Sequence, residues 1–254
     1  MTKERIISAA IAIPVVVLLL WLKPLYYLMN GIIVVFFVNE FMSMNSVDKK
    51  WVPLFLAFFA PFFILKGWSI YYLIGTFYVL LVYSLFWIGS KKGAKFNSTA
   101  FFAIVYAAIL SFTSLVLRMR HGSFLLLNMF VVIWVADSAA YFVGSRFGKH
   151  KLMEKISPNK TVEGSIGSVL GAIAVQLLLA PLFKIGISWP VAIFWGFAIS
   201  VFAQVGDLIE SMFKRSAGVK DSGNIMPGHG GVMDRLDSIL FTAPLYYFFI
   251  ELFL

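Results

Sequence analysis

The sequence contains nine long runs of apolar residues, and this pattern limits the fold more than any other feature. A helix that crosses the hydrocarbon core of a bilayer needs about 20 mostly apolar residues. The runs cover residues 6–22, 25–44, 51–66, 68–90, 99–117, 123–145, 165–183, 188–212 and 236–254, and the third contains two prolines. Outer-membrane strands would instead alternate in segments of about ten residues. We therefore predict an all-α polytopic integral membrane protein with about nine transmembrane helices.

Composition excludes a soluble fold. Hydrophobic residues make up 61% of the chain and charged residues 13%, with a mean hydropathy of +0.90, whereas about a quarter of the residues in a soluble domain are charged. The absence of cysteine excludes disulfides and thiolate metal sites. A net charge of +9 would suggest nucleic acid in a soluble protein, but lysine and arginine are expected in cytoplasmic loops here, so no nucleic-acid partner is predicted.

The basic residues predict the orientation. We place the N-terminus in the cytoplasm, read the first run as a retained span, and assign the loops alternately. Sixteen of the 21 basic residues then lie inside: Lys3, Arg5, Lys49, Lys50, Lys91, Lys92, Lys95, Arg146, Lys149, Lys151, Lys155, Lys160, Lys214, Arg215, Lys220 and Arg235. Five lie outside: Lys23, Lys66, Arg118, Arg120 and Lys184. This asymmetry follows the positive-inside rule and supports nine spans.

Chemistry-bearing side chains gather in the second half of the chain. One helical face is predicted to carry Asp207 and the residues 3, 4 and 7 positions after it, which are Glu210, Ser211 and Lys214. They could form a solvated helix end whose charges pair with each other. However, Asp207 lies inside an otherwise apolar run, where a carboxylate costs about 3 kcal/mol or more, and such residues usually point into a polar cavity. We therefore predict a functional role.

The loop predicted over residues 213–235 combines a glycine-rich turn with charges of both signs. Its glycines surround His229, so the backbone can turn tightly and present N–H groups to an anion. Asp234 and Asp237 are three residues apart at the start of the ninth run. Carboxylates beside cations, without cysteine, favour Mg²⁺ or another hard ion that keeps a phosphate substrate as a further ligand.

This segment resembles the signature of the phosphatidate cytidylyltransferases, the CDP-diacylglycerol synthases. The elements of that signature are Ser211, Lys214-Arg215, Lys220-Asp221, Pro227 to Gly231, Asp234-Arg235 and Asp237. A second block resembles residues 137–144 and 156–164, although Val162 stands where the family more often has Trp. The detailed match covers residues 134–240, about half of the chain.

The resemblance implies transfer of CMP from CTP to phosphatidate, giving CDP-diacylglycerol and pyrophosphate. It implies catalytic roles for Asp207, Lys214, Arg215, Lys220, Asp221, His229, Asp234 and Arg235. It implies substrate contacts for Asp137, Lys160, Glu163, Ser211, Gly228, Gly230, Gly231 and Asp237. The expected metal ligands are Asp207, Asp234, Glu210 and Asp237, holding Mg²⁺ with room for a second cation. A homodimer in the inner (plasma) membrane, with its active site facing the cytoplasm, is also implied.

Some of the charged residues and glycines have an interpretation that involves no catalytic role. Asp137 could be a carboxylate hydrogen-bonded within a helix bundle. The spacing of Gly164, Gly167 and Gly171 favours close helix packing over a phosphate loop. Arg118 and Arg120 fall outside in the predicted topology, so they receive no catalytic role.

Two other classes of function remain open. A secondary transporter would also contain buried acids, but it commonly has two related halves with sites in both. Here nine of the twelve acids lie in the second half (residues 123–254) and only three in the first (residues 1–122). A CDP-alcohol phosphotransferase or a polyprenol kinase-like transferase is a nearer rival. The Asp-Gly-x-x-Ala-Arg pattern of the former is absent from the sequence.

Overall fold

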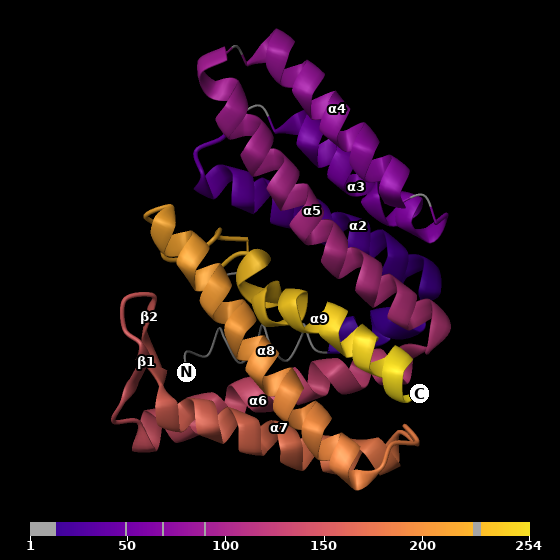
Figure 1. Cartoon of the computed structure of the whole chain (residues 1–254), viewed down its shortest axis with the longest axis vertical. Coiled ribbons are helices and arrows are strands. Elements are labelled where there is room, and N and C mark those ends of the chain that lie inside the picture. The colour runs from indigo at the N-terminus through magenta and orange to yellow at the C-terminus, as the bar shows by residue number, and fades with distance from the viewer. Residues whose placement is uncertain (1–13, 49, 68, 89, 226–229) are drawn as a thin grey trace. The chain divides into compact units, whose positions relative to one another are not determined.

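In the computed structural model, residues 14–48, 50–67, 69–88, 90–225 and 230–254 are described, and most of them are helical (Figure 1). The helices are α2 (Lys23–Met44), α3 (Trp51–Leu65), α4 (Ser69–Trp87), α5 (Ser90–Arg120), α6 (Ser123–Phe147), α7 (Val162–Leu182), α8 (Trp189–Ser216) and α9 (Met233–Phe253). Two strands, β1 (Lys151–Met153) and β2 (Ser157–Thr161), separate α6 from α7. Residues 14–21 are also helical. Each predicted apolar run therefore coincides with a helix, the first of them over its described part.

The lengths of these helices support the predicted membrane class. Within the described ranges, six helices are long and apolar enough to cross a membrane: α2, residues Lys92–Arg120 of α5, α6, α7, α8 and α9. The apolar parts of α3 and α4, Trp51–Phe63 and Tyr71–Phe86, are shorter. The all-α membrane fold is confirmed at this level, whereas the number of nine spans and the position of the N-terminus stay predictions.

Several helix ends differ from the predicted run ends. Helix α5 begins at Ser90 rather than residue 99, and the basic segment between them contains no proline that would interrupt its hydrogen bonds. Helix α8 continues through Lys214 and Arg215 to Ser216, and α9 begins early enough to hold Asp234 in its first turn. Cations in a last turn and an acid in a first turn interact favourably with the helix dipole. The loop predicted over residues 213–235 is therefore shorter.

A β-hairpin between α6 and α7 was not predicted. Strands β1 and β2 pair antiparallel, with Lys151 opposite Thr161 and Met153 opposite Ser157, and the register shifts between the two pairs. Thr161 ends the hairpin and caps α7, because its side-chain oxygen accepts a hydrogen bond from the Gly164 N–H at 3.1 Å.

The described chain groups into two compact units. The first comprises Met1–Val116 and Ala217–Leu236, and the second comprises Leu117–Ser216 and Asp237–Leu254. The segment 217–236 thus groups with the N-terminal helices. The division predicted at residue 122, between apolar spans and a catalytic half, stays a prediction.

Helices α2 to α5 form the body of the first unit, and aromatic and polar contacts join them. Between α2 and α5, the Phe37 and Tyr106 rings meet edge to face with centroids 5.6 Å apart. The Ser114 hydroxyl donates a hydrogen bond to the buried Asn30 side chain at 2.9 Å. Such hydrogen bonds satisfy polar groups that lipid cannot solvate.

Glycines allow the helices of the second unit to approach closely. A methyl group on Gly167 would lie 2.7 Å from the Val143 side chain, and one on Gly171 would lie 2.7 Å from Ala139 Cβ. Both neighbours belong to α6, which lies along α7 (Figure 1). The interpretation of this glycine series as a packing surface, rather than a phosphate loop, is confirmed.

Candidate active site

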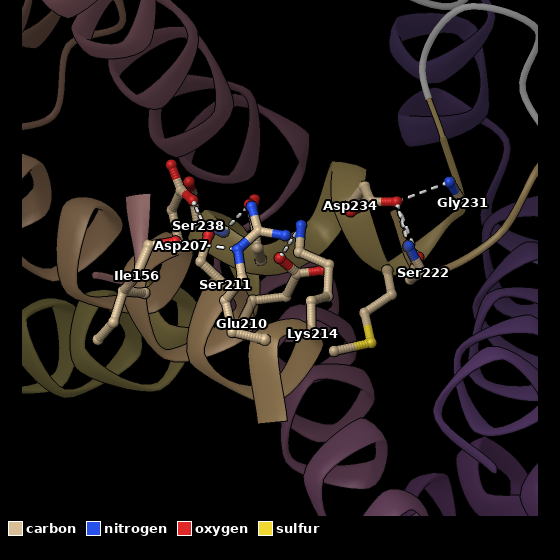
Figure 2. Close-up of polar contacts among 12 residues, drawn as sticks. Ile156, Asp207, Glu210, Ser211, Lys214, Ser222, Gly231, Asp234 and Ser238 are labelled. Atoms are coloured by element: carbon tan, nitrogen blue, oxygen red, sulfur yellow. Dashed lines mark hydrogen bonds and ion pairs between the residues drawn. The ribbon is translucent and has the colours of Figure 1, made fainter. Parts of the chain in front are cut away.

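The second unit contains a cluster of opposite charges around the cytoplasmic end predicted for α8. The Lys160 ammonium on β2 forms an ion pair with an Asp207 carboxylate oxygen at 2.5 Å. The Ser211 hydroxyl, one turn further along α8, donates to the other Asp207 oxygen at 3.3 Å (Figure 2). Lys160 and Asp207 are both half-buried, and the Lys160 ammonium nitrogen itself is shielded from solvent. The structure thus brings together three residues predicted for the site.

A second ion pair lies on the same helix. The Glu210 carboxylate pairs with the Lys214 ammonium four residues later, and the Glu210 side chain is 1% exposed. Arg215 follows, and its Nε donates to the Ile156 carbonyl oxygen of the hairpin turn at 3.2 Å. Because removing one partner of a buried pair leaves an uncompensated charge, Glu210 and Lys214 depend on each other.

Helix α9 brings another carboxylate to this cluster. Gly206 of α8 is packed so closely against α9 that a methyl group there would lie 2.6 Å from the Asp237 carbonyl oxygen. The charged groups that act on the Asp237 carboxylate are Asp207, which repels it, and Lys214 and Lys160, which attract it. Two acids and two cations of the second unit therefore share one region.

These carboxylates can be tested as ligands of the implied metal. Among the described residues, no three histidine, aspartate or glutamate side chains are grouped in a way that could hold a metal ion. Asp207 and Asp237 do repel each other, and a hard divalent cation held with substrate phosphate oxygens as further ligands would relieve that repulsion. A cation at Asp207 would have to displace Lys160, just as one at Glu210 would have to displace Lys214.

Two further residues predicted to contact substrate lie on α6 and α7. Glu163, in the first turn of α7, accepts hydrogen bonds from the backbone N–H groups of Lys149 and His150 and pairs with the His150 ring at 2.7 Å. In this arrangement Glu163 fixes the base of the hairpin that carries Lys160. Asp137 lies on α6 with an exposed side chain.

In the first unit, Asp234 organises the glycine-rich segment. One of its carboxylate oxygens, Oδ2, accepts hydrogen bonds from the Ser222 N–H, the Ser222 hydroxyl and the Gly231 N–H, at 2.8–2.9 Å (Figure 2). Gly230 has a φ of 81°, and a methyl group there would lie 2.5 Å from the same oxygen. The predicted tight turn is thus present in its described part, and it needs glycine for both reasons.

One of the N–H groups expected to meet a substrate anion, that of Gly231, is engaged by a protein carboxylate in this structure. Gly231 donates to Asp234, and the next two N–H groups, of Val232 and Met233, donate to Glu40 at 2.8 Å each. Buried N–H groups need an acceptor. Glu40 was missed in the sequence analysis, although a carboxylate in an apolar run is a signal that was applied to Asp207.

The remaining predicted residues differ in their surroundings. The side chains of Lys220, Asp221 and Arg235 are exposed. Gly228 and His229 lie outside the described residues. Outside the predicted site, Arg120 and His121 both contact the Glu251 carboxylate, at 3.2 and 3.3 Å.

The second unit thus offers cations that can bind phosphate oxygens beside acids that can hold a hard cation. Arg215 on α8 is exposed, whereas the ammonium group of Lys160 on β2 is buried against Asp207. Ammonium and guanidinium groups are the usual partners of phosphate. The arrangement suits transfer of a phosphoryl or nucleotidyl group.

Comparisons with known proteins agree with this chemistry. Residues 3–253 match the family described as "Cytidylyltransferase family". A protein of Haemophilus influenzae named phosphatidate cytidylyltransferase is 34% identical over 98% of both chains. Its namesake in Bacillus subtilis is 51% identical over 48% of this chain, and the match spans 46% of that relative's length. In Staphylococcus saprophyticus, a protein of the same name is 41% identical over 68% of this chain and 66% of its own.

Proposed function

The chain belongs to the cytidylyltransferase family, and from this premise we propose that it transfers CMP from CTP to phosphatidate. The products are CDP-diacylglycerol and pyrophosphate. The observation that carries the proposal is the group of cations and acids around Asp207 in a chain of long apolar helices. The names of the relatives supply the two substrates.

The reaction requires two polyanions to meet. A phosphate oxygen of phosphatidate attacks the α-phosphorus of CTP, a new P–O bond forms, and the bond to the β-phosphate breaks so that pyrophosphate leaves with its electron pair. The attacking phosphate is already an anion, so no general base is needed. Catalysis then consists of positioning the groups and offsetting their charge.

The cations of the second unit are suited to offset this charge. The Lys160 ammonium group is held beside Asp207 and shielded from solvent, so a phosphate must enter the cluster to compete for it. Lys214 is kept in place by Glu210, and Arg215 by the Ile156 carbonyl. We assign to Lys160 and Arg215 contacts with the reacting phosphates. Lys220 and Arg235 of the signature are further candidates because their side chains are exposed.

Metal dependence is part of the proposal. Asp207 and Asp237 would hold Mg²⁺, and the sequence adds Asp234, three residues before Asp237 on α9. Mg²⁺ keeps substrate phosphates among its ligands and lowers the repulsion between them. The protein's own part is to hold these carboxylates through α8 and α9.

The membrane arrangement follows from the substrates. Two acyl chains keep phosphatidate in the bilayer, whereas CTP is water-soluble, so we propose an active site at the cytoplasmic face of the plasma membrane. The basic residues support nine spans with the N-terminus inside. The homodimer rests on the family resemblance and is open to test by mass measurement of the detergent-solubilised protein.

The direct test uses purified protein in detergent with CTP and phosphatidate. We expect CDP-diacylglycerol by mass spectrometry and one pyrophosphate per lipid product, both only when the two substrates are present together. ATP in place of CTP serves as the control. Stoichiometric pyrophosphate release from CTP alone would indicate a cytidylylated enzyme and contradict direct attack. Phosphatidate that stays unmodified with CTP, under conditions where a known relative is active, would contradict the proposed function.

A further inference from the structure

Glu40 lies on α2, far in sequence from every residue of the signature, yet its carboxylate is surrounded by the signature segment. Glu40 is buried, with 3% of its surface exposed. Its Oε1 accepts a hydrogen bond from the Val232 N–H at 2.8 Å. Its Oε2 accepts one from the Met233 N–H at 2.8 Å and one from the Ser222 hydroxyl at 2.9 Å. All of these residues belong to the first unit.

These contacts place a negative charge at the start of α9. Val232 and Met233 are the residues at which α9 begins, and the first N–H groups of a helix have no acceptor within it. A carboxylate there satisfies the N–H groups and interacts favourably with the helix dipole. Because α9 also carries Asp234 and Asp237, whatever fixes its first turn also fixes the backbone from which these acids extend.

Ser222 connects Glu40 to Asp234 directly. Its hydroxyl lies 2.9 Å from a carboxylate oxygen of each residue. A hydroxyl has one hydrogen, so it donates to one carboxylate at a time. The Ser222 N–H donates to Asp234 in addition. The orientation of the Asp234 carboxylate therefore depends on Glu40, because both carboxylates contact the Ser222 hydroxyl.

Two glycines of the segment leave room for this carboxylate. A methyl group on Gly223 would lie 2.9 Å from Glu40 Oε1. A methyl group on Gly231 would collide with Glu40 Oε2 and with the Ser222 hydroxyl. The glycine content of the segment thus serves the approach of Glu40, in addition to the turn itself.

We propose that Glu40 is a positioning residue of the transferase, which holds the start of α9 and, through Ser222, orients the Asp234 carboxylate. The inference rests on the proposed function for its activity readout only. It implies that the N-terminal helices supply part of the support for the signature segment. A purely membrane-anchoring role for α2 would not require this carboxylate.

The test compares Glu40→Gln and Glu40→Asp with a matched control, Asn30→Ala. Asn30 lies on the same helix, is also buried, and hydrogen-bonds to Ser114 of α5. We expect Glu40→Gln to lower kcat on the order of tenfold or more, because its amide NH₂ group faces an N–H donor, with little change in the KM for phosphatidate. Glu40→Asp keeps the charge and is expected to recover part of kcat. Asn30→Ala is expected to lower thermal stability but to leave kcat within about twofold.

Hydrogen exchange gives a readout that is independent of activity. The amides of residues 231–233 are expected to exchange faster in Glu40→Gln and at the wild-type rate in Asn30→Ala. Ser222→Ala combined with Glu40→Gln should cost less kcat than the product of the two single effects, since both act on Asp234. Wild-type kcat in Glu40→Gln, or equal losses in Glu40→Gln and Asn30→Ala, would overturn the proposal. An inactive wild-type protein would contradict the proposed function. Unchanged amide exchange at residues 231–233 in Glu40→Gln would contradict the positioning role of Glu40, whether or not the protein is active.

Discussion

Replacement of Gly206 by alanine tests whether the approach of α8 to α9 sets the geometry of the acids. The added methyl group would lie 2.6 Å from the Asp237 carbonyl oxygen and 2.7 Å from Phe241 Cβ, whereas ordinary contact begins at 3.4 Å. The helices must therefore separate by about 0.8 Å at this point. Asp207 follows Gly206 directly, so the separation acts on the Asp207–Asp237 pair.

The expected magnitudes differ for stability and for activity. Overpacking of this kind costs about 1–3 kcal/mol of stability. A misplacement of about 1 Å at a reacting centre can cost on the order of a hundredfold in rate. We therefore expect Gly206→Ala to remain folded with a lower thermal midpoint and to lose about two orders of magnitude in kcat.

The assay measures CDP-diacylglycerol formation and thermal unfolding on the same detergent preparation. Gly75→Ala is the control, because Gly75 lies in α4 and nothing surrounds its Cβ position within 4 Å. Alanine should stabilise that helix by up to about 1 kcal/mol without changing kcat. A Gly206→Ala protein with wild-type kcat would refute the argument that this contact sets the active geometry.

Three further outcomes are expected. Lys160→Gln should lower kcat on the order of a hundredfold, because the Lys160 cation offsets phosphate charge. The change in stability should be small, because the partly exposed Lys160–Asp207 pair contributes little to folding. An equal loss of kcat in Lys151→Gln would contradict the role assigned to Lys160. Asp234→Asn should abolish turnover and also lower the thermal midpoint, since the Asp234 carboxylate accepts three buried hydrogen bonds. Wild-type turnover should stop with EDTA and return with Mg²⁺, and turnover that persists in EDTA would contradict metal dependence. On this cysteine-free background, Glu154→Cys should react with an impermeant thiol reagent only from the cytoplasmic side and Lys184→Cys only from the outer side, both positions being exposed; the reverse pattern would invert the topology.

Much of the site could be anticipated from local spacing. Asp207, Ser211 and Lys214 share a helical face because a helix repeats every 3.6 residues, and a carboxylate in an apolar run is costly enough to require a purpose. The ion pair of Glu210 with Lys214 is likewise a contact between residues four apart. Nothing in the spacing indicates that Lys160 would meet Asp207, since the contact depends on a hairpin whose alternation is too short to detect.

The membrane environment of this protein and its helical secondary structure follow from the sequence alone. Long apolar runs can satisfy their backbone groups in lipid only as helices, so the class and the approximate positions of the helices follow from composition and length. The series of glycines on α7 predicted close packing for the same local reason.

The distant residues that support the signature segment are visible only once the helices have packed together. Glu40 and Ser222 are separated by 182 positions, and no periodicity relates them. Their contact arises because buried N–H groups at the start of α9 need acceptors, and the packing of the first unit brings α2 to that point. The spacing of residues along the chain predicts the helices and their faces, whereas the partner of a buried charge depends on how the helices pack.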